Sequence, residues 1–159
     1  MCIRDRKSTC EDGFYTAGQN ETDDVVAAID WLKTKGVKSS NIGIYGSSLG
    51  ALIALMTPAK SNDFGSIAVM DPPVDFKTLV REEMAYQGLP TFLWEPIHHY
   101  ARIFKGVNML KDIPEEALAK GNKQPLLIFT GLLSDRVQPH HYDDLLNISL
   151  LYTSTIPRD

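Results

Sequence analysis

The sequence predicts an α/β fold, in which helices cover both faces of a parallel sheet. Two apolar runs, residues 66–70 and 125–130, are continuous rather than alternating, which is typical of parallel strands buried on both faces. Helical patterns precede and separate the expected strands, as crossover connections require. A serine flanked by glycines, Ser48, also stands where an expected strand meets an expected helix.

The first and clearest expected helix covers residues 22–35. Its apolar side chains recur at i, i+3, i+4 and i+7, which places them on one face: Val25, Ala28, Ile29 and Leu32. Asn20 or Thr22 is suited to cap the start of this helix. Gly36 is suited to the left-handed residue that ends it.

The first expected strand, residues 42–46, runs directly into the pattern G-x-S-x-G at residues 46–50. A good helix-forming run follows this pattern. In that setting the motif predicts a nucleophile elbow, a sharp turn that exposes the hydroxyl of Ser48. Gly46 and Gly50 are expected because a side chain at either position would collide across so tight a turn. The alternative is a strand-to-helix turn that merely contains a serine.

Residues 74–122 separate the expected strands 66–70 and 125–130 and are too many for a simple crossover. They are rich in aromatic and aliphatic side chains, and three prolines are expected to break them into short helices: Pro90, Pro96 and Pro114. Two interpretations stay open for this insert. It is a helical layer packed on the sheet, or a cap whose apolar inner wall binds an acyl or alkyl group.

A serine nucleophile needs a base, an acid that orients the base, and donors for the oxyanion. The backbone N–H of Leu49 is the first expected oxyanion donor. Asp135 is the best candidate acid, because it follows the carboxyl end of the strand 125–130; capping of the next helix is its alternative role. Asp71 is the rival acid, although the two prolines after it favour a turn or capping role.

No histidine stands where the base is expected. His98 and His99 lie in the insert as adjacent residues, which point in different directions on a helix, and this favours surface exposure or packing over metal binding. His140 and His141 follow Asp135 too closely and are better suited to packing or capping. We therefore expect the catalytic histidine, and the second oxyanion donor, to lie outside this chain.

With these residues in view, the chain resembles the α/β-hydrolase superfamily, above all esterase-like members related to dienelactone hydrolases and the catalytic domain of prolyl oligopeptidases. The resemblance rests on the elbow and on residues 16–31, 71–73 and 131–139, and covers about residues 12–147. It implies a partial α/β-hydrolase fold and cleavage of an ester, thioester or amide in a small-molecule or peptide substrate through an acyl-serine intermediate. It implies neither a cofactor nor a metal.

The alternative to a hydrolase is a non-catalytic binding protein of the same fold. Ser48 and Asp135 argue against it, because a binding module has no need of an elbow.

The chain also departs from the family. About eight strands are usual, and three are expected here; Thr130 stands where the family often has a histidine before the glycine. Both ends resemble translated adapter sequence, so residues 1–6 and 150–159 are expected to be artefactual. Residues 7–149 are expected to be a fragment of the hydrolase domain that is inactive by itself.

Composition narrows the remaining classes. The 159 residues carry a net charge of -4 and are 43% hydrophobic, so nothing favours a nucleic-acid backbone or an anionic membrane as partner. No apolar run reaches the roughly 20 residues of a membrane span. Cys2 and Cys10 form neither a disulfide framework nor a metal motif. A cytoplasmic protein is the expectation.

Overall fold

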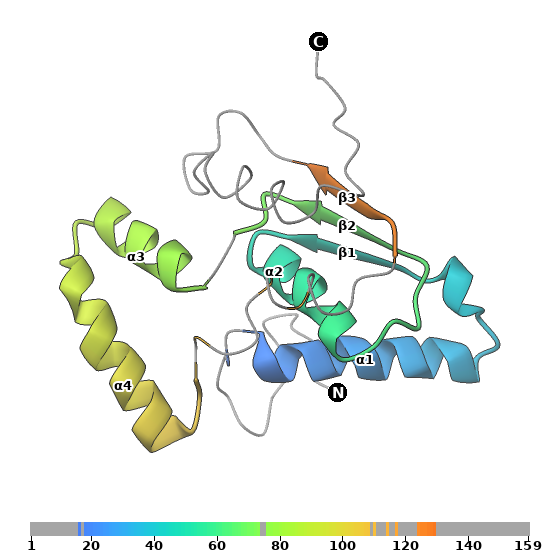
Figure 1. The fold of residues 1–159 in the computed structure, drawn as a ribbon, viewed down its shortest axis with the longest axis horizontal. Helices are drawn as coiled ribbons and strands as arrows, with labels where there is room; N and C mark the ends of the chain where they lie inside the picture. Colours follow the sequence, from blue (N-terminus) through green and yellow to red (C-terminus); the bar gives the residue numbers. More distant parts are fainter. Residues whose placement is uncertain are drawn as a thin grey trace, which may run out of the picture.

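The computed structural model describes residues 16, 18–73, 76–108, 110, 114, 117 and 124–129. Within these ranges the helices and strands follow one another in a simple order (Figure 1). They are α1 (Gln19–Thr34), β1 (Gly43–Ser47), α2 (Leu49–Met56), β2 (Ser66–Met70), α3 (Phe76–Tyr86), α4 (Trp94–Lys105) and β3 (Leu126–Phe129), with short 3-10 turns at Ser39–Asn41, Thr57–Ala59 and Thr91–Leu93.

The three strands form a parallel sheet in the order β1-β2-β3. Ile44 pairs with Ile67, and Ile67 pairs in turn with Leu126. The prediction of parallel strands from continuous apolar runs is therefore confirmed. The first strand lies one residue later than expected, at Gly43–Ser47 rather than 42–46.

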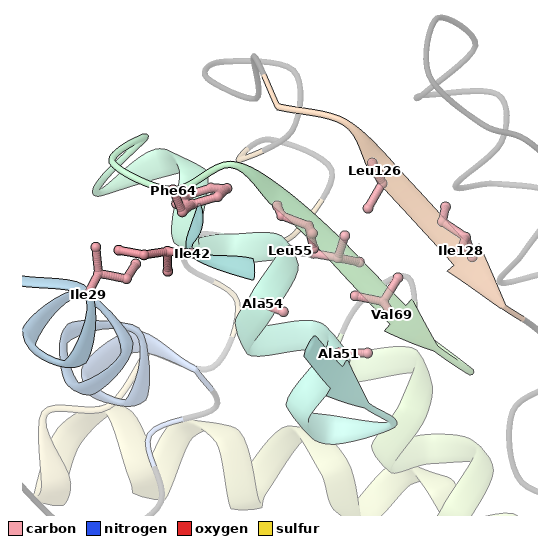
Figure 2. Close-up of a cluster of buried hydrophobic side chains, with 10 residues drawn as sticks. Ile29, Ile42, Ala51, Ala54, Leu55, Phe64, Val69, Leu126 and Ile128 are labelled. Carbon is pink, nitrogen blue, oxygen red and sulfur yellow. The ribbon is translucent and has the colours of Figure 1, made fainter. Parts of the chain in front are cut away.

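The core lies between the sheet and the helices α1 and α2 (Figure 2). Small side chains on α2, Ala51 and Ala54, let this helix approach the sheet closely, and both are buried. The remaining members of the cluster come from α1, α2, β2, β3 and the segments just before β1 and β2: Ile29, Ile42, Leu55, Phe64, Ile67, Val69, Leu126 and Ile128. This cluster fixes the position of α2, and hence of the turn that precedes it.

The start of α1 differs from the expectation, because the helix begins three residues before residue 22. Glu21 caps it: its carboxylate accepts the backbone N–H of Gly18 at 3.0 Å and the hydroxyl of Thr16 at 2.7 Å. The Thr16 hydroxyl accepts the Asn20 N–H at 2.8 Å. The prediction of Asn20 or Thr22 as cap is wrong, since the Thr22 hydroxyl donates to the Gly18 carbonyl inside the helix.

The face and the end of α1 agree with the sequence. Ile29 is buried, and Val25 and Leu32 pack against the same core. Gly36 has φ 83°, and its N–H donates to the Lys33 carbonyl at 2.9 Å. A left-handed glycine therefore ends the helix as predicted.

The insert forms two helices, α3 and α4, that lie beyond the carboxyl ends of the strands (Figure 1). Pro90 separates them as expected. Pro96 does not break α4, because it stands in the first turn, where a backbone N–H has no intrahelical acceptor. Pro114 is buried, in a segment described only at isolated residues. α3 and α4 lie beyond the strand ends rather than across a face of the sheet, which differs from the layer interpretation, and the cap interpretation stays a prediction.

No helix within the described ranges is both long and apolar enough to cross a membrane.

Candidate functional site

Ser48 occupies the single residue between the end of β1 and the start of α2. Its backbone has φ 51° and ψ -117°, a region that non-glycine residues rarely adopt. The residue is exposed. The strand-turn-helix setting predicted for the G-x-S-x-G motif is therefore present, and strain of this kind tends to occur at functional sites.

Gly46 shows why the turn needs glycine. A Cβ atom built on Gly46 would lie 2.2 Å from the carbonyl oxygen of Gly50 and 2.8 Å from the backbone nitrogen of Ala51. Both are backbone atoms, so they cannot move aside without opening the turn. The predicted steric role of Gly46 is confirmed.

Gly50 behaves differently. Setting aside the backbone of its own helix, no described atom lies within 4 Å of a Cβ built there. The predicted collision at Gly50 is therefore wrong for the described residues. The tight contact at this turn is between the Cα region of Gly46 and the backbone of Gly50. Only position 46 therefore has to lack a side chain, because every residue has the backbone atoms of position 50.

Hydrogen bonds fix the backbone of Ser48 on both sides. Its N–H donates to the carbonyl of Met70 on β2 at 2.9 Å, which is the last hydrogen bond of the β1–β2 ladder. Its carbonyl accepts the N–H groups of Ala51 at 2.9 Å and Leu52 at 3.2 Å. The backbone of Ser48 is thus held by both the sheet and the helix, while its exposed side chain lies at the carboxyl end of the sheet.

Leu49 is the first residue of α2. An N–H group at this position has no acceptor within the helix, and the helix dipole is positive at this end. These two properties suit the N–H to a negatively charged oxygen beside Ser48. The oxyanion role expected for Leu49 stays a prediction.

Asp71 follows β2 and lies next to Ser48 at the same carboxyl end of the sheet. The strands pair Ser47 with Met70, so Ser48 and Asp71 are the next residues of their chains. Asp71 has φ 48° and donates its N–H to the Phe129 carbonyl at 2.8 Å. Its left-handed backbone gave no sequence signal beyond the two prolines after it.

The candidate acid Asp135 lies outside the described residues. So do His140 and His141, which are predicted to pack or cap beside Asp135, and Thr130 and Gly131 after β3. Their roles stay predictions.

The two histidines of the insert differ from each other. His98 is only 4% exposed and its ring stacks on that of Trp94, with centroids 5.7 Å apart. His99 is exposed. Burial lowers the pKa of His98, and the neighbouring His99 lowers it further. The described residues contain no group of three or more His, Cys, Asp or Glu side chains that could hold a metal ion.

The fold matches solved structures of hydrolases. An esterase from Pyrococcus furiosus superposes with a TM-score of 0.67 at 23% identity, over 92% of this chain and 54% of its own. An esterase domain from a Rhodothermus marinus protein gives 0.59 at 16%, over 90% and 59%. A puromycin-hydrolyzing peptidase from Mycobacterium tuberculosis gives 0.63 at 16%, over 89% and 22%. These likenesses show the α/β-hydrolase fold.

No curated protein matches this sequence. The chain spans about half the length of the Pyrococcus esterase that it matches. The model of the prolyl oligopeptidase family matches residues 11–147, which include every strand and helix described above. The chain therefore belongs to the prolyl oligopeptidase family.

Proposed function

We propose that this chain carries the nucleophile of a serine hydrolase that cleaves an ester, thioester or amide bond. The observation that carries the proposal is the geometry of Ser48. This exposed serine is held at φ 51° between β1 and α2, in a chain of the prolyl oligopeptidase family.

The proposed chemistry proceeds in two steps. The Ser48 hydroxyl oxygen attacks the substrate carbonyl while a histidine base takes its proton and later gives it to the leaving group. The negative oxygen of the tetrahedral intermediate accepts a hydrogen bond from the Leu49 N–H. The same histidine then takes a proton from water as the water oxygen attacks the acyl-serine carbonyl, and it returns this proton to the Ser48 oxygen as the acid leaves. In this scheme Asp135 orients the base, and the base lies outside this chain.

The substrate is proposed to be a small-molecule or peptide acyl compound. The solved structures that this chain matches include proteins named esterases and a protein named a puromycin-hydrolyzing peptidase. Ester and amide substrates therefore both have support among structures of this fold. α3 and α4 lie beyond the carboxyl ends of the strands. This placement supports the proposal that the insert contributes an apolar wall to the substrate pocket.

The 159 residues by themselves are proposed to be inactive, because an acyl-transfer site without its histidine loses most of its acceleration. A non-catalytic binding role is the alternative, and it gives no reason for the strained backbone of Ser48. The function is therefore tested on the complete gene product.

The test compares two neighbouring serines. Hydrolysis of p-nitrophenyl butyrate and of an aminoacyl p-nitroanilide is measured for the complete gene product and for Ser48→Ala and Ser47→Ala. Ser47 is exposed and ends β1, so it is a matched control. We expect Ser48→Ala to lose a factor of about 10⁴ or more in kcat, and Ser47→Ala to stay within about tenfold of the wild type. Equal activity of the wild type and Ser48→Ala would refute the proposal.

A further inference from the structure

We propose that Asp71 is a positioning residue for Ser48, and that it acts through its left-handed backbone rather than through its carboxylate. The inference rests on the proposed function in taking Ser48 as the nucleophile. It adds a second strained residue, one strand away, that holds the Ser48 turn in place.

The ends of β1 and β2 are built alike. Ser48 donates its N–H to Met70, the last residue of β2, at 2.9 Å; Asp71 donates its N–H to Phe129, the last residue of β3, at 2.8 Å. Each residue then leaves the sheet at positive φ, 51° for Ser48 and 48° for Asp71. In the part of the chain that the structure describes, these are the only two non-glycine residues with positive φ.

One peptide group connects the two strand ends. The planar unit between Met70 and Asp71 contains both the carbonyl that accepts the Ser48 N–H and the N–H that donates to Phe129. Because this unit is rigid, its two hydrogen bonds share one orientation. The φ angle of Asp71 sets that orientation relative to the chain that follows.

The chain that follows cannot move freely. Pro72 and Pro73 come directly after Asp71, and both side chains are fully buried. If φ of Asp71 changed sign, either the prolines would leave their buried positions or the peptide group would rotate. Rotation would remove the acceptor of the Ser48 N–H. The left-handed conformation of Asp71 is thus required for the turn at Ser48 as observed.

Residue types differ in their tolerance of this conformation. Asparagine and aspartate adopt it more readily than other residues with a side chain, and glycine adopts it freely. Alanine is less favourable, and a β-branched valine is the least favourable of these. A backbone role therefore predicts the order Gly, Asn and Asp before Ala, and Ala before Val. A carboxylate role predicts that all four replacements fail.

The experiment measures the second-order rate of fluorophosphonate labelling of Ser48 in the complete gene product. We expect Asp71→Asn and Asp71→Gly to stay within about twofold of the wild type. Asp71→Val should slow labelling by about tenfold or more, and Asp71→Ala should lie between. Rates for Asn and Gly as low as the rate for Val would overturn the inference.

A control separates positioning from general loss of stability. Phe64 is buried just before the amino end of β2, far along the strand from Ser48. Phe64→Leu should lower the melting temperature yet label at the wild-type rate. If it slows labelling as much as Asp71→Ala at equal loss of stability, the positioning role is refuted.

A second readout does not depend on catalysis. Amide hydrogen exchange at Ser48 reports the bond to Met70 directly. We expect faster exchange in Asp71→Ala than in Asp71→Asn, and unchanged exchange in Asp71→Ala would overturn the inference. If the wild type fails to label, the proposed function fails, and the exchange result still decides the role of Asp71.

Discussion

The carboxyl end of the sheet at Ser48 and the helices α3 and α4 differ in how much of their structure is fixed by contacts with the rest of the fold. At the carboxyl end, Ser48 and Asp71 each donate a backbone hydrogen bond to the next strand, and the core packs behind them. In the insert, large apolar side chains face outward: Phe92, in the 3-10 turn between α3 and α4, and Ile103, on α4, are each 72% exposed. The first region is therefore suited to fixing reacting atoms, and the second to being varied without loss of the fold.

The largest difference is expected between the two glycines of the turn. Gly46→Ala places a Cβ 2.2 Å from a backbone oxygen, so we expect a loss of more than about 4 kcal/mol or failure to fold. Gly50→Ala meets no described atom within 4 Å beyond its own helix backbone and should be neutral or stabilising by up to about 1 kcal/mol. Urea denaturation measures both, and similar losses for the two variants would contradict the geometry.

A matched pair of aliphatic residues tests the contrast between the core and the insert. Leu55→Ala removes a fully buried side chain behind the sheet and should cost about 2–5 kcal/mol. Ile103→Ala removes a side chain of the same size that is 72% exposed on α4, and should change stability by less than about 0.5 kcal/mol. Denaturant midpoints give both values. A cost above about 2 kcal/mol at Ile103 would show that α4 is buried against something.

The smallest expected effect is a pH dependence within the insert. Burial lowers the pKa of His98, and His99, Arg102 and Lys77 lower it further, against the opposing influence of Glu95. The unfolded chain then binds a proton more readily than the folded one, so stability falls as pH drops below the unfolded pKa of about 6.5. It levels off below the lowered folded pKa. In His98→Phe, the fall in melting temperature between about pH 7.5 and 5 should be smaller than in the wild type. An equal fall would contradict the assignment.

Much of the fold followed from periodicity. The apolar face of α1, its glycine end and the parallel pairing of the strands all depend on local pattern and burial, which the sequence displays. The start of α1 did not follow, because Glu21 reaches back to Thr16 and Gly18 rather than leaving the cap to Asn20 or Thr22. A sequence offers several capping residues and does not say which side chain reaches the free N–H groups.

The site was predictable in part. The pattern at residues 46–50 located the turn, and the structure bears out its strand-turn-helix setting. The left-handed backbone of Asp71 was not predictable, since it depends on where the two buried prolines after it are anchored. The difference between His98 and His99 likewise depends on which face of α4 is covered. Asp135, the candidate acid, lies outside the described residues.

The most direct test of Ser48 as the nucleophile is the site of covalent labelling. The complete gene product is treated with a fluorophosphonate probe and digested with trypsin, and the peptide covering residues 39–60 is sequenced by tandem mass spectrometry. This peptide contains both Ser47 and Ser48, so the spectrum distinguishes them. We predict a single adduct on Ser48 that is lost after heat denaturation. If the folded protein carries no adduct, or carries the adduct on Ser47 instead, Ser48 is not the nucleophile.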